Sequence, residues 1–155
     1  MEMVVIGGVA AVALGVPYVT QDLDICYSPE PANVRRLIVA LKAVGAHLRV
    51  ARMGDHEARA LPFQWDERTF RDNEMLTLQT DLGPIDLLKD IPGVGDYAAI
   101  KACSMQVNAF GLTFFALDLP GLVTNKKASG RRKDLLALPL LEATLRAREL
   151  DEQQP

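Results

Sequence analysis

The chain has 155 residues, enough to bury a core as one ordinary domain, and a formal net charge of -3, which argues against a general nucleic-acid coat protein. Its two cysteines are too few for a disulfide framework and fit a reducing cytosol. The N-terminal apolar stretch is interrupted by glycines and a proline and lacks a basic flank, so it is a poor signal peptide and too short to span a bilayer. Composition therefore predicts a cytoplasmic protein that forms one domain over residues 1–155.

The first half of the chain alternates apolar runs with helical spacing. A Ser-Pro-Glu-Pro sequence at 28–31 is a start signal for the second helix, and Gly45 marks its end. The predicted elements are, in chain order, a strand at 3–6, a helix at 9–14, a strand at 23–27, a helix at 34–44, a polar loop at 53–60 and a helical turn at 66–71.

The second half predicts two hairpins followed by helices. Pro139 is expected to kink or restart the last helix because proline lacks an N–H, and Cys26 and Cys103 are expected to pack as small core residues. The predicted elements are strands at 74–80 and 85–88, a helix at 97–102, strands at 105–108 and 112–117, and helices at 119–128 and from 134 to about 150. The fold class is therefore α/β (α+β), with a mixed sheet and a helical C-terminal portion at 118–150.

A glycine pair and two aspartates near the N-terminus form the most informative pattern. Gly7 and Gly8 end the first apolar run, and Asp22 and Asp24 enter the second. Residues i and i+2 of a strand face the same side, so both carboxylates point to one spot, and Mg²⁺ is the usual cation that compensates such a pair. A glycine turn that opens a helix suits phosphate. The pattern predicts a site for a metal-bound nucleoside triphosphate, although on their own the two acids could be solvent-facing residues at a strand edge.

Asp86 is the third acidic candidate. It stands in an apolar Ile-x-Leu-Leu run, where a charged residue is usually paired or functional. Two-metal phosphoryl transfer requires a third carboxylate opposite the pair. The alternative is a residue at the start of a strand, bonded to the turn at Gly83.

The basic residues concentrate around one helix break, at Ser129-Gly130. They could neutralise a triphosphate or hold an RNA backbone. The alternative is a solvated helix end whose cations are favoured by the macrodipole. The cluster consists of Lys126, Lys127, Arg131, Arg132 and Lys133.

Other catalytic patterns are missing from the sequence. His47 and His56 show no metal-ligand spacing to each other or to a cysteine, so zinc is not expected. The chain has no Gly-x-Ser-x-Gly, no Walker lysine loop and no Gly-x-Gly-x-x-Gly.

Two stretches together resemble the nucleotidyltransferase superfamily, and in particular small prokaryotic members such as minimal nucleotidyltransferases and toxin-like proteins of abortive-infection systems. The first consists of Gly7-Gly8, then Thr20-x-Asp22-x-Asp24-Ile25, then Ile85-Asp86-Leu87-Leu88. The second reads Leu122-Val123-x-x-Lys126-x-Ala128-x-Gly130-Arg131-x-Lys133-Asp134.

This resemblance implies a polymerase-β-like mixed sheet and assigns roles to single residues. Asp22, Asp24 and Asp86 would be catalytic and would bind Mg²⁺ or Mn²⁺. Gly7, Gly8, Thr20, Lys126, Arg131 and Lys133 would contact the NTP or the acceptor. The chain departs from many relatives in having Tyr18 where they carry an arginine, and in starting almost at the first strand, so that either the natural start lies upstream or the chain is a trimmed variant.

The resulting hypothesis is a Mg²⁺-dependent nucleotidyltransferase that moves a nucleoside monophosphate from an NTP to a hydroxyl of RNA, protein or a small molecule. In-line attack at the α-phosphorus requires placement and charge neutralisation but no nucleophilic side chain. The alternative is a non-catalytic nucleotide-binding or toxin–antitoxin interaction module with a degenerate site, which would have an antitoxin-type protein partner. No membrane association is expected, and a homo-oligomer remains open.

Overall fold

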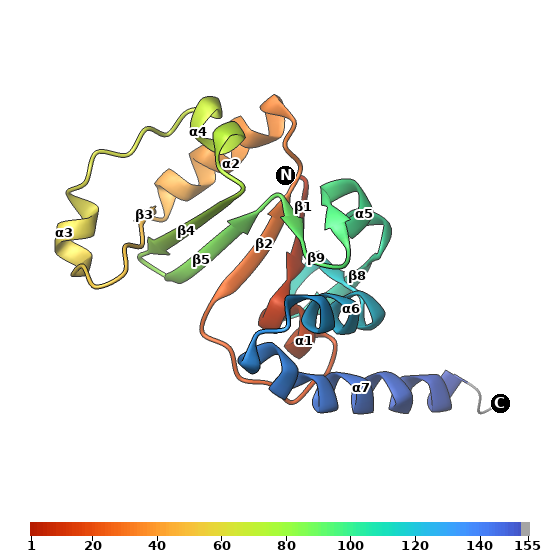
Figure 1. Ribbon diagram of the computed structural model, residues 1–155. Coiled ribbons are helices and arrows are strands. Elements are labelled where there is room, and N and C mark those ends of the chain that lie inside the picture. Colours follow the sequence, from red (N-terminus) through yellow and green to blue (C-terminus); the bar gives the residue numbers. More distant parts are fainter. Residues whose placement is uncertain (153–155) are drawn as a thin grey trace.

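Seven strands form one mixed sheet at the centre of the structure, a computed structural model that describes residues 1–152 (Figure 1). The order across the sheet is β3-β4-β5-β2-β1-β9-β8, and β6 and β7 form a separate two-stranded ribbon. The strands are β1 (Met3–Ile6), β2 (Leu23–Tyr27), β3 (His47–Leu48), β4 (Met75–Thr80), β5 (Gly83–Leu88), β6 (Asp90–Ile91), β7 (Gly95–Asp96), β8 (Ser104–Ala109) and β9 (Leu112–Leu117).

Helices lie against both faces of the sheet. The last and longest of them runs along the bottom of Figure 1 and its C-terminal part extends beyond the sheet. The helices are α1 (Gly7–Ala13), α2 (Pro31–Ala43), α3 (Asp55–Arg59), α4 (Glu67–Asp72), α5 (Tyr97–Ala102), α6 (Leu119–Ser129) and α7 (Arg132–Glu152). The mixed α/β class is confirmed. No helix within residues 1–152 is long and apolar enough to cross a membrane.

The register of the central strands sets the position of the acidic residues. β1 is antiparallel to β2 and β2 is parallel to β5, so the end of β1 meets the starts of both. In this register Ile6 lies opposite Asp24, and Asp24 lies opposite Asp86. Thr77 of β4 lies opposite Asp86 on the other side. One cross-strand row therefore carries two of the three predicted acids, which come from segments about sixty residues apart in the sequence.

The two halves of the sheet are covered on opposite faces. On β2, β5 and β4, alternate residues such as Ile25, Leu87 and Leu78 are buried under α2 and Phe70 of α4. On β1 and β9, the other core includes residues of α1, α5, α6 and α7. Because side chains alternate along a strand, the residues between the buried ones on β2, β5 and β4 face away from α2. On this face Cys26 is buried in the second core, whereas Met75 of β4 is 50% exposed, so the face that carries Asp24 and Asp86 is covered in part and open on the β4 side.

Three local predictions are wrong. The 53–60 segment contains helix α3, which has too little apolar periodicity to be recognised but is started by acids in its first turn, with the Glu57 carboxylate accepting from the Gly54 N–H. Cys103 is exposed because it directly follows the last turn of α5. The last helix does not restart at Pro139, which lies inside α7. Pro139 and Leu135, whose carbonyl loses its helical partner, are both exposed, so the missing hydrogen bond faces solvent.

Candidate active site

The glycine pair lies directly against the first residues of the acidic segment. Gly7 has a φ of 62°, and a Cβ there would lie 2.9 Å from the Asp24 carboxyl carbon. A Cβ on Gly8 would lie 2.5 Å from the Thr20 Cβ. Neither approach tolerates a side chain, so the two glycines allow the backbone to lie beside Asp24 and Thr20.

This geometry predicts a specific effect of Gly7→Ala. Alanine at a positive φ costs about 1–3 kcal/mol of stability wherever it occurs. Gly15 has a φ of 87° and an added Cβ there would meet nothing within 4 Å, so Gly15→Ala is a matched control that shares only the backbone strain. We expect Gly7→Ala to lose more stability in urea unfolding than Gly15→Ala, since it also displaces the Asp24 carboxylate. Equal losses in the two variants would contradict the close approach.

The predicted site residues line two neighbouring clefts. The first has a volume of about 130 Å³, and its lining includes all three acids, Gly8, Thr20 and three of the basic residues. The second, of about 370 Å³, is lined by Gly7 and shares Asp24, Lys126 and Arg131 with the first. Tyr18, the residue that stands in place of an arginine, also lines the first cleft. Residues from four separate parts of the sequence, around 7, 22, 86 and 130, therefore meet at one place.

Burial disfavours the charged form of two acids in the cleft. Burial, followed by the nearby Asp86 carboxylate, raises the pKa of Asp24 to about 6, although Lys126 and Lys133 act in the opposite direction. Burial also raises the pKa of Asp86, against the lowering effect of Arg49. A further cation nearby stabilises the charged form of a carboxyl group that is disfavoured in this way.

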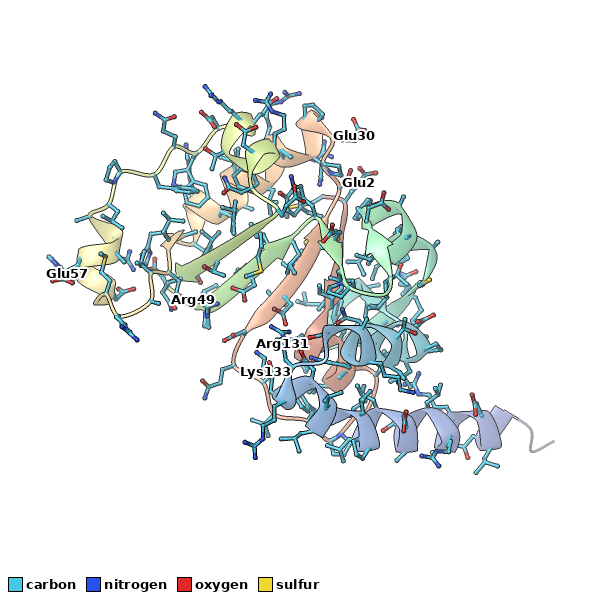
Figure 2. All side chains as sticks on the ribbon, in the orientation of Figure 1. Glu2, Glu30, Arg49, Glu57, Arg131 and Lys133 are labelled. Carbon is cyan, nitrogen blue, oxygen red and sulfur yellow. The ribbon has the colours of Figure 1, made fainter. Side chains whose placement is uncertain are left out.

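An arginine that the sequence did not indicate lies between two of the acids. Arg49 Nη2 donates to Asp86 Oδ1 at 2.5 Å, and its Nη1 lies 3.6 Å from Asp22 Oδ2. In Figure 2, Arg49 lies on the β4–β5 side of the site, and Arg131 and Lys133 lie on the side of the C-terminal helices. β3 has two residues, too few for a strand pattern that would have aligned Arg49 with β4 and the acids.

The basic cluster divides into two groups. Lys126, Arg131 and Lys133 line the first cleft, whereas Lys127 pairs with Glu142 at 2.8 Å and, like Arg132, is not part of the cleft lining. Lys126 is 12% exposed, so for this residue the alternative of a solvated helix end is wrong. Gly130, with a φ of 63°, ends α6 and allows the chain to turn so that the cations of α6 and α7 converge.

A buried carboxylate organises these cations. Asp134, 1% exposed, accepts hydrogen bonds from Lys126 Nζ, from Ser129 Oγ at 2.6 Å and from Arg131 Nε at 2.6 Å. Burial acts to raise the pKa of Asp134, but the hydrogen bonds from these three side chains outweigh it and lower the pKa to about 2. Asp134 therefore remains ionised and fixes the direction of two cations beside the cleft.

The donor set of the cleft fits a hard divalent cation. Its three acids offer only carboxylate oxygens, the ligands that Mg²⁺ and Mn²⁺ prefer, and the pKa of Asp24 is raised by burial and by the neighbouring Asp86 carboxylate. As placed, however, no three His, Cys, Asp or Glu side chains within the described residues lie close enough together to hold a metal ion. One of the three carboxylates, Asp86, is paired with Arg49.

Comparison with known proteins places the fold. No protein-family model matches the chain, and no curated protein sequence matches it. Among solved structures, the chain is similar to the lincosamide antibiotic adenylyltransferase LnuA with lincomycin bound, with a TM-score of 0.56 and 12% sequence identity over 92% of this chain and 87% of that one. The chain therefore has the polymerase-β-like nucleotidyltransferase fold that the sequence motifs implied. At this identity the likeness concerns the fold alone.

Proposed function

We propose that the protein is a Mg²⁺-dependent nucleotidyltransferase that moves a nucleoside monophosphate from an NTP to a hydroxyl group and releases pyrophosphate. One observation carries the proposal: three carboxylates from β2, the segment before it and β5 line the same small cleft as Lys126, Arg131 and Lys133. Acids that can hold a divalent cation and bases that can neutralise a triphosphate are the two parts that phosphoryl transfer requires. The nucleotidyltransferase fold supports this assignment.

Each group of residues has a distinct task in this proposal. Gly7, Gly8 and Thr20 provide a surface on which phosphate oxygens approach the backbone closely. Lys126 and Arg131, oriented by Asp134, neutralise the charge of the triphosphate. The acids Asp22, Asp24 and Asp86 would hold the metal, which supplies electrostatic stabilisation of the phosphoryl oxygens when bound.

Asp86 has a second task at the acceptor. It lies on the open face of the sheet, beside β4, where a hydroxyl-bearing molecule can approach without displacing a helix. Its raised pKa makes it a better proton acceptor than an ordinary carboxylate. Asp86 thus helps to position the acceptor hydroxyl and to remove its proton.

The acceptor class is RNA, protein or a small molecule. The solved structure to which the chain is similar is a lincosamide antibiotic adenylyltransferase, which makes ATP and a small hydroxylated molecule the first pair to test. The chain's negative net charge gives no additional support to RNA.

The direct test is transfer of label from each α-³²P-labelled NTP, with Mg²⁺ or Mn²⁺, to a panel of hydroxylated small molecules, total RNA, total protein or the enzyme itself. We expect label to appear with the wild-type protein and not with an Asp22→Asn/Asp24→Asn double variant. Label from γ-³²P-labelled NTP would contradict nucleotidyl transfer, because that phosphate leaves with pyrophosphate.

A second candidate is a non-catalytic nucleotide-binding module, with a protein partner of the antitoxin type. The observation that favours it is the pairing of Arg49 with Asp86, which occupies one of the three acids. Equilibrium binding separates the two candidates. A module of this kind binds NTP and leaves it intact in the presence of every acceptor, whereas the enzyme consumes it.

A further inference from the structure

We propose that Arg49 is a positioning residue of the acidic site: its guanidinium holds Asp22 and Asp86 together in the metal-free protein and competes with the divalent cation for their oxygens. The inference rests on the proposed function, since it assumes that these acids bind a metal. It adds a residue and a form of regulation that the sequence motifs do not contain.

The contacts place Arg49 between the acids. One guanidinium nitrogen donates to Asp86 Oδ1 at 2.5 Å and the other lies 3.6 Å from Asp22 Oδ2. Asp86 is the more enclosed partner, with a side chain 16% exposed, whereas that of Asp22 is 41% exposed. A charge-assisted hydrogen bond to a carboxylate in a partly enclosed setting is stronger than an ion pair at the surface.

The backbone of Arg49 is fixed to the sheet. Its N–H donates to the Thr77 carbonyl at 3.0 Å, and the Thr77 hydroxyl donates to the Arg49 carbonyl at 3.4 Å. Thr77 in turn lies opposite Asp86 in the register. Thr77, Asp86 and Asp24 therefore form one row across β4, β5 and β2, and Arg49, directly after β3, is bonded to the β4 end of that row. Main-chain bonds hold the residue in place, so a change of side chain does not release it.

A guanidinium and a divalent cation cannot both use these oxygens. A metal bound to Asp22 and Asp86 requires the lone pairs that now accept from Arg49, and it adds positive charge beside the guanidinium. The Arg49 side chain is 33% exposed, so it has access to solvent when displaced. The arginine therefore weakens metal binding by the free energy of its own pairing, and limits repulsion between the acids while the metal is absent.

The test measures Mn²⁺ binding to the metal-free protein by calorimetry, together with thermal unfolding in EDTA. For Arg49→Met we expect Mn²⁺ affinity to rise about tenfold, the factor that corresponds to loss of one charge-assisted hydrogen bond. We also expect a lower melting temperature in EDTA, because the acids then repel one another without compensation. Arg49→Gln should tighten Mn²⁺ binding similarly, and it replaces Arg49→Met in the test if that variant does not fold. Arg49→Lys keeps the charge and should stay near the wild type.

The matched control is Arg36→Met. Arg36 is exposed on α2, which covers the opposite face of the sheet, so the substitution removes the same charge far from the acids. Arg36→Met should leave Mn²⁺ affinity unchanged. A rise in affinity equal to that of Arg49→Met would show that the change in net charge alone explains the effect, and would overturn the proposal.

The outcomes also separate this proposal from the proposed function. If the wild type binds Mn²⁺ and Asp24→Asn abolishes that binding, but Arg49→Met and Arg49→Gln bind no more tightly, the role of Arg49 is wrong and the metal site stands. If neither the wild type nor the arginine variants bind Mn²⁺, the metal site is wrong and both proposals fall together.

Discussion

Asp24→Asn is expected to raise the free energy of unfolding by up to about 3 kcal/mol at neutral pH, from the conversion of a shift between pKa values of 3.8 and about 6. The same substitution should reduce nucleotidyl transfer at least about 100-fold, the scale of losing one key electrostatic group in an active site. The physical reason for the gain is that burial and the neighbouring carboxylates disfavour the charged form of Asp24 in the folded protein. Asparagine fills the same space without a charge.

The gain in the free energy of unfolding of Asp24→Asn should depend on pH. Because folding raises the pKa of Asp24, the native state binds more protons than the unfolded state between the two pKa values. The wild type therefore loses stability, relative to Asp24→Asn, as the pH rises from about 4 to about 6, and the difference is constant above that range. Urea unfolding of both proteins at several pH values, in EDTA so that bound metal does not stabilise the wild type, measures this difference.

Asp90→Asn provides the control for net charge. Asp90 is exposed and is not part of the lining of either cleft, so its substitution removes the same formal charge without relieving burial. It should change neither stability nor transfer appreciably. A loss of stability in Asp24→Asn at neutral pH would contradict the interpretation of Asp24 as a functional residue held at a cost, and would make it a structural one.

The acids of the candidate site could be selected from the sequence because they belong to local patterns. The first pattern is an apolar run followed by a glycine pair, and the second is an Asp-x-Asp at the start of the next apolar run. Each of the two patterns spans fewer than about ten residues. The spacing of Asp22 and Asp24 predicted that both lie on one strand and share a face, but β2 begins at Leu23, so Asp22 precedes the strand. The structure instead places Asp24 and Asp86 opposite each other in register. The metal-binding and catalytic roles of these residues remain predictions.

The sequence did not indicate Arg49, and it contained Asp134 in the second motif without assigning a role to it. Arg49 follows a strand of two residues, and only its hydrogen bond to Thr77, 28 residues later, brings it to the acids. Asp134 resembles an ordinary acid in the first turn of a helix, favoured there by the macrodipole. Its burial against Lys126 depends on the turn at Gly130, whose angle no sequence pattern specifies.

Asp134→Asn is expected to lower the free energy of unfolding by about 3 kcal/mol, since removal of one member of a buried ion pair leaves its partner uncompensated. Lys126, 12% exposed, would lose its charged partner, and Ser129 and Arg131 would keep at most one neutral acceptor. NTP affinity should also fall, because two cations beside the cleft would no longer be held in one direction. Chemical denaturation and NTP titration of the same variant measure the two effects.

Glu142→Gln tests whether the burial of Asp134 is the cause of the losses expected for Asp134→Asn. Glu142 is paired with Lys127, a lysine of the same basic cluster, but both side chains lie at the surface, where an ion pair contributes little. We expect Glu142→Gln to have a small effect on stability and none on NTP affinity. Similar losses in both variants would contradict the view that Asp134 acts through its buried position.

The pH dependence of Asp134 has the opposite sign to that of Asp24. Folding lowers the pKa of Asp134 from 3.8 to about 2, so its contribution to stability is complete above the first value and is lost as the pH falls through the second. The stability difference between the wild type and Asp134→Asn should therefore shrink below pH 4, whereas that of Asp24→Asn grows above it. Two aspartates beside one cleft would thus differ in sign, because hydrogen bonds from three side chains outweigh burial at Asp134, whereas burial and the neighbouring carboxylates outweigh the nearby lysines at Asp24.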